Sequence, residues 1–384
     1  MGKIKILVGL GLVLALFPLR HGNAQSDGIQ IPTSERIMSR GWWPTKGSAA
    51  REEYVGSAAC AQCHKHKVQT QKTTPMANTA MAPLDSTFLT SRPKIVGQLG
   101  PYHYDLVHND KQVQYSVSNG KSSASGSLIW VFGSGEHGQT YVYEQDGTFY
   151  ESRVSYYASP QALDLTTGHS PATPSKVEAA LGRPMDPDGA RLCFGCHTTA
   201  STTHYRFDPG QLIPGVACEG CHGPGSRHVA AMNLDPDVSG PKDILNPANL
   251  SPIDSVEFCG VCHRSRIDVV LNRATGLEDV RFQGYRLETS KCFGTGDARI
   301  TCIACHDPHE RLVRDSGAYD KNCLACHAAK ASVKAPADHY AVACPVKERD
   351  CVTCHMPKVE APSMHSTFTD HRIRIVKAGA PFPE

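Results

Sequence analysis

The sequence repeats one pattern, Cys-x-x-Cys-His, seven times, and this repeat restricts the possible folds more than any other feature. It uses 14 of the 16 cysteines in the 384-residue chain. Two thiols one helical turn apart can bond the two vinyl groups of a porphyrin, and the adjacent imidazole then lies under the iron as its proximal ligand. We therefore predict seven covalently attached haems c, numbered in chain order and held by Cys60, Cys63 and His64; Cys193, Cys196 and His197; Cys218, Cys221 and His222; Cys259, Cys262 and His263; Cys302, Cys305 and His306; Cys323, Cys326 and His327; and Cys351, Cys354 and His355.

Two other chemistries also use paired cysteines. Zinc sites contain Cys-x-x-Cys pairs, but they do not require a histidine directly after every second cysteine, as found here. A redox dithiol of the thioredoxin type needs only one such pair. Cys292 and Cys344 lie outside the repeat. The sequence leaves open whether these two residues form a disulfide or remain separate thiols, because it does not give the distance between them.

The sixth ligand of each iron decides what a haem can do. An open face binds small molecules, whereas a second protein ligand makes the haem an electron-transfer centre. The chain has 19 histidines, more than the seven proximal ligands need. His228 and His309 each follow a proximal histidine on a turn stiffened by glycine or proline, which favours ligation of a neighbouring haem. The predicted ligands opposite the proximal histidines are His137, His169, His228, His309, His339, His365, His371 and Met76.

Haem 1 has the weakest set of local ligands. Its motif is followed by His66 and, further along, by Met76. A thioether ligand would raise the potential of this haem relative to bis-histidine neighbours, but methionine is also a common core residue. The sequence therefore leaves three options for haem 1: ligation by Met76, ligation by His66, or an open face. We expect structural or surface roles for His103, His108 and His204.

The N-terminus has the pattern of a secretory signal peptide, with a basic start, an apolar run from Ile6 to Phe17 and small residues up to Ala24. The run is shorter than the 20 or so residues of a transmembrane helix. We expect residues 1–24 to be removed and the mature protein to be periplasmic or secreted, without a membrane span. The leader carries three basic residues and no acidic ones, so the formal charge falls from +2 to about −1. Without a large basic cluster, no nucleic-acid partner is expected.

The spacing of the motifs divides the mature chain. Between haem 1 and haem 2, residues 93–158 alternate or run in β-favouring side chains, with turn signals at Asn119-Gly120 and Asp146-Gly147. We predict a small antiparallel β unit here. Residues 25–92 form an N-terminal segment with haem 1, and residues 159–384 form the cluster of haems 2–7 with a C-terminal tail of distal ligands.

The mature chain is too short to give each haem its own domain, because without residues 1–24 it has only about fifty residues per haem. The porphyrins must then supply much of the core. The predicted fold class is a multihaem cytochrome c, with short helices and long loops around stacked haems. One helix is predicted from Ser175 to Gly182, with Ser175 and Glu178 as a capping box, and another from Ser251 into the haem 4 motif at His263.

Several phrases resemble the exported multihaem c-type cytochromes related to the tetrahaem carrier of ammonia oxidisers and to the octahaem reductase and hydroxylamine oxidoreductase group. They are "YVGSAACAQCH", "GVACEGCHGPGSRHV", "TCIACHDPH", "CVTCHMPK" and "HSTFTDHRI", and the likeness runs from about Tyr54 to Ile375. The resemblance implies that His228, His309 and the histidines near the C-terminus are distal ligands. Many relatives have histidine where this chain has Met76, and this departure puts the ligation of haem 1 in doubt.

Three hypotheses of function follow. The first is an electron carrier between a membrane-linked donor and a downstream acceptor, working through mostly bis-histidine haems. Haem propionates would make such a holoprotein acidic and favour basic redox partners. The second is a multihaem reductase or oxidase of small nitrogen or sulfur compounds, with haem 1 open and assisted by His66, Lys65 or Lys72. The third is an extracellular cytochrome polymer.

Overall fold

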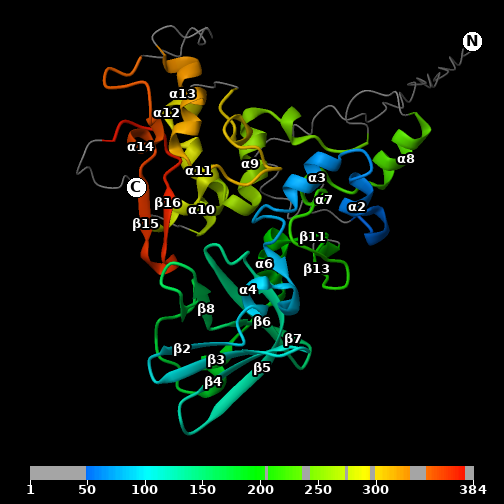
Figure 1. The fold of residues 1–384 in the computed structure, drawn as a ribbon, viewed down its shortest axis with the longest axis vertical. Helices are drawn as coiled ribbons and strands as arrows, with labels where there is room; N and C mark the ends of the chain where they lie inside the picture. The colour runs from blue at the N-terminus through cyan, green and yellow to red at the C-terminus, as the bar shows by residue number, and fades with distance from the viewer. Residues whose placement is uncertain are drawn as a thin grey trace, which may run out of the picture.

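The computed structural model describes residues 49–203, 206–235, 243–272, 276–294, 299–328 and 343–376. The predicted leader, His204 and His339 lie outside these residues. Figure 1 shows an antiparallel sheet at one end of the molecule and short helices at the other, with α6 (Pro187–His197) and α4 (Thr87–Thr90) between them. This arrangement is compatible with the predicted fold class of short helices and a β unit.

The sheet has ten strands, and every pairing in it is antiparallel. Seven strands follow one another in the order β10-β7-β6-β5-β4-β3-β2, while β1 pairs with β5 and β8 links β6 to β9. It reaches beyond the predicted 93–158 because segments before and after that range add strands. The strands are β1 Ala80–Met81, β2 Lys94–Leu99, β3 Tyr102–His108, β4 Val113–Ser118, β5 Ser123–Phe132, β6 Gly138–Gln145, β7 Thr148–Ser152, β8 Val154–Tyr157, β9 Ala162–Leu165 and β10 Gly182–Pro184.

Both turn signals lie where hairpins form. Asp146 and Gly147 join β6 to β7 with φ angles of 50° and 75°, the left-handed pair that a two-residue hairpin turn requires. Gly120 has a φ of 83° in the β4–β5 turn. There the Asn119 side-chain oxygen accepts hydrogen bonds from the backbone N–H groups of Lys121 and Ser122, at 3.0 and 2.9 Å. The hairpin turns are therefore specified locally.

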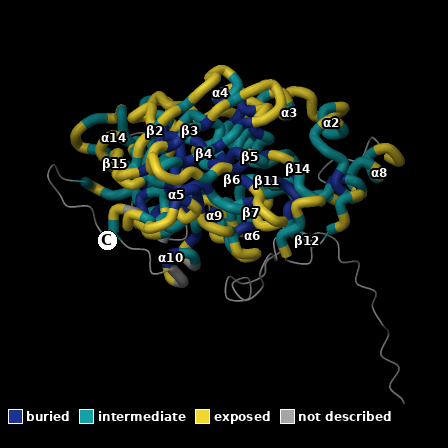
Figure 2. Tube along the Cα trace, turned by 90° about the horizontal axis from the view of Figure 1, so that it is seen from below, coloured by how far each residue is buried: buried dark blue, intermediate teal, exposed yellow. Residues whose placement is uncertain are grey.

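Tyrosines dominate the core beneath the sheet. Tyr104 and Tyr115 are almost fully buried and stack on each other, with ring centres 6.2 Å apart. Their hydroxyls donate to the carbonyls of Ala180 and Leu181, at 3.0 and 2.9 Å. These carbonyls belong to the end of α5 (Val177–Leu181), so the tyrosines satisfy polar groups that a helix end leaves open. Figure 2 shows buried positions gathered along these strands and sparse around α3 and α8.

The helices are short, and several end at an attachment motif. α6, α7, α9, α13 and α14 each end at the histidine of a Cys-x-x-Cys-His motif. A helical turn places the two cysteines on one face, as bonding to one porphyrin requires. The remaining bounds are α2 Ser57–Cys60, α3 Lys65–Gln71, α7 Glu219–His222, α8 Ser226–Leu234, α9 Pro252–His263, α10 Arg266–Asn272, α11 Gln283–Glu288, α12 Lys291–Gly294, α13 Asp320–His327 and α14 Cys351–His355.

The two predicted helices are both present, with one correction. Ser251 caps α9, its hydroxyl accepting from the Asp254 N–H at 3.2 Å, and Pro252 occupies the first helical position. The helix predicted from Ser175 begins later, with Lys176 as its N-cap residue and no side-chain cap bond. The capping box predicted there was wrong, because the helix starts one residue too late for Ser175 to cap it.

Three two-stranded ladders lie among the helices. The first pairs β11 (Thr198–Thr199) with β14 (Ile213–Pro214), and the second pairs β12 (Thr202–Thr203) with β13 (Arg206–Phe207). In the third, β15 (Lys358–Ala361) pairs with β16 (Ser366–Thr369) near the C-terminus. None of the helices among the described residues is long and apolar enough to cross a membrane.

Candidate haem centres

Three motif histidines, which are predicted proximal ligands, have their Nδ1 atoms close to backbone carbonyls. The Nδ1 atoms of His222 and His355 lie 2.8 and 2.9 Å from the carbonyl oxygens of Leu245 and Arg374. His197 Nδ1 lies 3.0 Å from the carbonyl oxygen of Thr79. His197 Nδ1 also lies 2.6 Å from the Thr79 hydroxyl, which can donate or accept. A carbonyl only accepts, so in the contacts of His222 and His355 Nδ1 carries the proton and Nε2 presents its lone pair. This is how metal-binding histidines are usually held.

Three pairs of histidines face each other across a gap of iron-binding size. Ring centres are 6.5 Å apart for His64 and His228, 6.0 Å for His222 and His309, and 6.2 Å for His306 and His371. An imidazole nitrogen binds a metal at about 2.0–2.1 Å and the ring centre lies roughly 1 Å behind it, so two rings on opposite sides of one metal have centres roughly 6 Å apart. Each pair consists of a motif histidine and a predicted distal ligand.

Two of the predicted distal histidines have orienting hydrogen bonds of their own. His371 Nδ1 donates to the carbonyl of Thr369 at 2.9 Å, and His309 Nδ1 lies 2.9 Å from a carboxylate oxygen of Asp307. A hydrogen bond from Lys67, 2.8 Å away, is the main cause that lowers the pKa of Asp307 to about 2. Burial lowers the pKa of His371 to about 4. The neutral imidazole, which is the form that binds metals, is therefore the stable form of His371 near neutral pH.

The buried carboxylate of Glu219 explains how His64 meets His228. Glu219 is one of the variable residues of the third motif and is only 1% exposed. Its oxygens accept hydrogen bonds from the backbone N–H groups of Val55 and Gly56, both at 2.9 Å, and of Gly225 at 2.8 Å. The first two lie just before α2 and the third just before α8. Glu219 thus connects the residues just before motif 1 with the segment that carries His228.

Cysteines of different motifs also come together. The thiols of Cys60 and Cys218, of Cys259 and Cys302, and of Cys323 and Cys351 lie close enough for the second member of each pair to raise the pKa of the first. In every pair both residues are the first cysteine of their motif, so motifs 1 and 3, 4 and 5, and 6 and 7 are direct neighbours. Cys196 of motif 2 donates to the carbonyl of Val261, inside motif 4, at 3.5 Å. The attachment sites therefore form three groups of neighbours: motifs 1 and 3; motifs 2, 4 and 5; and motifs 6 and 7.

The exposure of the motifs fits a covering porphyrin. The second cysteines Cys63, Cys262, Cys305 and Cys354 are exposed, and so are apolar side chains beside or within motifs, such as Leu192 at 50% and Ile303 at 40%. Exposed thiols beside exposed aliphatic side chains are unfavourable on a finished surface. Covalent haem would remove both features, since it bonds the thiols and covers the apolar groups. The residues present therefore fit haem c.

Three other predicted ligands have different partners in the structure. His169 Nε2 lies 3.0 Å from the carboxylate of Glu151, with a side chain only 4% exposed. His365 Nε2 lies 2.8 Å from the carboxylate of Asp164. His137, an exposed residue, has its Nδ1 3.3 Å from the Ser366 hydroxyl. Ligation of haem by these three histidines stays a prediction, because the contacts just described do not join any of them to a motif histidine.

The structure also bears on the residues near haem 1. His66 is exposed, and the Met76 side chain is half-buried while its carbonyl accepts from the Val216 N–H at 3.0 Å. His103 is exposed on β3, in line with the surface role expected for it. No disulfide joins the described cysteines, Cys292 and Cys344 included. Within the same residues, no group of three or more His, Cys, Asp or Glu side chains could hold a bare metal ion.

Sequence reasoning missed the groups that orient these histidines. Carbonyl acceptors such as that of Leu245 carry no sequence signal, because every residue has a carbonyl. Asp307 did carry a sequence signal. It lies two residues before His309, and its carboxylate also accepts from the His309 N–H at 2.9 Å, as in an Asx turn.

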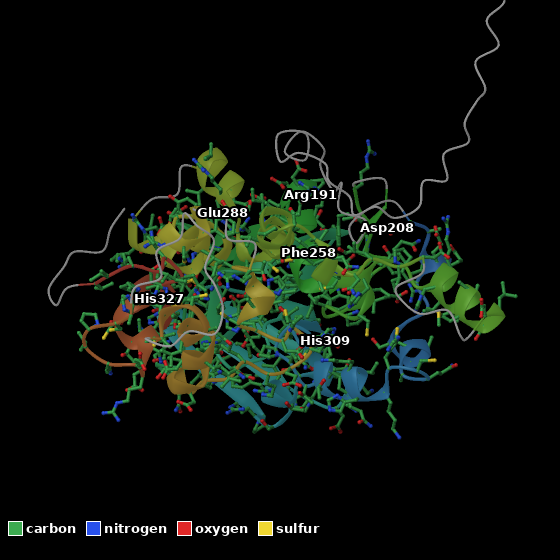
Figure 3. All side chains as sticks on the ribbon, turned by 90° about the horizontal axis from the view of Figure 1, so that it is seen from above. Arg191, Asp208, Phe258, Glu288, His309 and His327 are labelled. Atoms are coloured by element: carbon green, nitrogen blue, oxygen red, sulfur yellow. The ribbon has the colours of Figure 1, made fainter. Side chains whose placement is uncertain are left out.

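Figure 3 labels His309 beside α3 and His327 in a separate part of the cluster.

Comparison with known proteins agrees with this chemistry. The family model for cytochrome c554 and c-prime matches residues 153–223, which include motifs 2 and 3. The multiheme cytochrome MtrA of Shewanella baltica (strain OS185) is 26% identical in an alignment of 203 residues, and the match covers 42% of this chain and 61% of that protein. A solved structure titled outer cell wall cytochrome OcwA has a TM-score of 0.45 and 16% identity, over 84% of this chain and 80% of that one.

The matching family model and the curated relative, together with the seven attachment motifs, support the interpretation of this chain as a multihaem c-type cytochrome. Proteins of this class transfer electrons through covalently bound haem. The aligned region spans about three fifths of the curated relative.

Proposed function

We propose that this chain is an exported heptahaem c-type cytochrome that transfers electrons between redox partners through mostly bis-histidine haems. The observation that carries the proposal is the set of three histidine pairs with ring centres 6.0–6.5 Å apart. Bound haem supplies one-electron exchange at its iron. The chain supplies the ligands on both sides, the hydrogen bonds that fix their tautomers, and the cysteines that hold each porphyrin.

Ligands are exchanged between motifs in a regular way. The segment after motif 3 carries His228 to the histidine of motif 1, and the segment after motif 5 carries His309 to the histidine of motif 3. The C-terminal tail carries His371 to the histidine of motif 5. Each such segment completes a centre that another part of the chain begins, so neighbouring centres are built from shared elements.

The contacts between motifs support a continuous route for electrons. The thiols of motifs 1 and 3, of motifs 4 and 5, and of motifs 6 and 7 lie close enough to shift one another's pKa values. Cys221 also raises the pKa of Cys259, and Cys305 that of Cys323, so motif 3 lies near motif 4 and motif 5 near motif 6. We propose the order 1-3-4-5-6-7, with motif 2 as a branch beside motif 4 through the Cys196 contact.

His228 is the favoured sixth ligand of haem 1, ahead of Met76 and His66. Its ring plane lies at 17° to that of His64. This weakens the enzyme hypothesis, which relied on an open face at haem 1. The leader pattern supports export to the periplasm or beyond, where the proposed partners are a membrane-linked donor and a downstream acceptor.

The test uses the purified holoprotein. Intact mass should show seven haems, electron paramagnetic resonance of the oxidised form should be dominated by low-spin signals, and the reduced form should take up little carbon monoxide. Carbon monoxide binding by most of the haems would overturn the proposal, because it would show that most sixth positions are open.

A further inference from the structure

A fully buried ion-pair network lies directly behind His371. The Arg286 side chain on α11 is 1% exposed, and those of Asp370 and Asp279 are 0% and 2% exposed. Arg286 donates to both carboxylate oxygens of Asp370, from Nε at 2.8 Å and from Nη2 at 2.9 Å. A third bond runs from its Nη1 to Asp279 at 3.2 Å. The paired geometry with Asp370 is the strong, directional form of such contacts.

Neighbouring bonds hold the backbone around the ligand. The Ser290 hydroxyl donates to the carbonyl of His371 at 3.2 Å and accepts from the Ile373 N–H at 2.8 Å. The Asp370 carboxylate also accepts from the Arg372 N–H at 3.0 Å. The segment that presents His371 is thus fixed on both sides of the ligand by Arg286 on α11 and by Ser290 just after that helix, both far away in the sequence.

Stability alone is a weak reason for such a network. Replacing a buried ion pair with apolar side chains is often neutral or stabilising, because taking charges out of water is costly. A planar guanidinium does, however, fix the place and direction of a carboxylate better than apolar packing does. A cluster of this kind directly beside an iron ligand is well suited to fixing that ligand's position.

We propose that Arg286 and Asp370 are positioning residues that hold His371 in register with His306, 6.2 Å away between ring centres. The inference rests on the proposed role of His371 as sixth ligand of haem 5. Neither residue touches the iron in this account. Their effect is to keep the imidazole within bonding distance.

The same network reaches a second centre. Arg374 donates to the Asp370 carboxylate through its side chain. Its backbone carbonyl accepts from Nδ1 of His355, the proximal histidine of motif 7, and its N–H donates to the His355 carbonyl at 3.2 Å. A shift of Asp370 therefore disturbs the orienting bond of His355 too. Such bonds tune the potential of a bound metal.

The chain offers a matched pair of substitutions. Asp370→Asn and Asp279→Asn each remove one buried carboxylate charge facing Arg286, but only Asp370 belongs to the ligand segment. In holoprotein with seven haems by mass, Asp370→Asn should lose one low-spin haem per molecule and gain carbon monoxide binding at that haem. Asp279→Asn should keep the wild-type spectrum. The reference variant His371→Ala should lose the same low-spin signal.

The outcomes separate the two levels of the account. An unchanged spectrum in His371→Ala would show that His371 is no ligand, and it would overturn that assignment together with the positioning role. The other outcome concerns the positioning role alone. If His371→Ala converts one haem to high spin, but Asp370→Asn and Asp279→Asn give the same spectrum as each other, the positioning role is overturned and the assignment of His371 as a ligand stands.

A further variant keeps the test decisive if Asp370→Asn yields no holoprotein. Arg286→Lys keeps the buried positive charge but loses the paired hydrogen bonds to Asp370. It should give a partial high-spin signal from the same haem, and a fully low-spin spectrum would then overturn the positioning role.

Discussion

In the sheet, Tyr104, Tyr115 and Val131 are at most 1% exposed, whereas α2, α3, α8, α13 and α14 contain no buried residue at all. The two regions differ in what fills their interiors. The sheet encloses its own tyrosine and aliphatic side chains. The helices that carry or adjoin the motifs leave thiols and apolar groups open, which indicates that haem completes their core. One chain therefore combines a self-sufficient unit with a region that depends on its cofactor.

The largest expected effect is that of withholding haem. In protein produced without haem attachment, β2 to β8 should keep slow amide exchange, because their core contains no haem. The helices at motifs 1, 3, 5, 6 and 7 should exchange at rates close to those of an unfolded chain. Hydrogen exchange followed by mass spectrometry of apo- and holoprotein measures both. Equal protection of the two regions in the apoprotein would contradict the claim that the helical region, unlike the sheet, needs haem to fold.

A core truncation in the sheet should come next in size. Tyr115→Ala removes a fully buried ring and the hydroxyl bond to Leu181, and it should lower the free energy of unfolding of the sheet by about 3–5 kcal/mol. Denaturant unfolding of the holoprotein, followed by tyrosine fluorescence, measures this loss. Haem spectra before the transition should stay as in the wild type. A changed spin state would show that the two regions are not separate.

Glu219 sharpens the comparison, because it is one of the buried side chains within the haem-binding region and lies inside an attachment motif. Glu219→Gln replaces one acceptor oxygen with an NH₂ group that faces backbone donors. The remaining oxygen can still accept from Val55 and Gly225, but the Gly56 N–H then faces the new NH₂ group and loses its acceptor. The expected loss in stability is about 1–3 kcal/mol, with weaker coordination at haem 1 because Gly56 lies just before motif 1. Thermal unfolding monitored at the haem absorption band measures it, with Tyr115→Phe as a control that acts in the sheet. No change in either haem 1 or stability would remove Glu219 from the account.

The smallest effect should come from the surface ion pair of Lys67 with Asp307. Their side chains are 47% and 39% exposed, so Lys67→Ala should cost only about 0–1 kcal/mol, less in high salt. Low-spin signals should persist, because Asp307 still binds His309 directly. Urea titrations at two salt concentrations measure the difference. A loss of a low-spin haem would show that Lys67, and not Asp307 alone, positions His309.

The sequence was most informative where chemistry demands a local pattern. Attachment motifs, hairpin turns at Asn119-Gly120 and Asp146-Gly147, and the Ser251 cap all depend on residues within a few positions of each other. The prediction that His228 and His309 ligate neighbouring haems, not those of the motifs they follow, also rested on residues within a few positions of each other. In these cases short-range geometry limits the backbone to a few conformations.

Other features depend on contacts between distant residues, and the sequence could not supply them. Arg286 and Asp370 are 84 positions apart, and Glu219 and Gly56 are 163 apart. The acceptors for His222 and His355 are backbone carbonyls, which have no side-chain identity. His169 and His365 show the converse: both lie in loops suited to a ligand, yet each has a carboxylate partner. Which histidine meets which motif is decided by the folded chain.

The central claim is that three histidine pairs hold iron from opposite sides. Its most direct test is electron paramagnetic resonance, with carbon monoxide titration, of three single variants: His228→Ala, His309→Ala and His371→Ala. We predict seven attached haems in each, with one haem converted to a high-spin, carbon-monoxide-binding form, while the control His103→Ala on β3 matches the wild type. Spectra identical to the wild type in all three variants would contradict the claim.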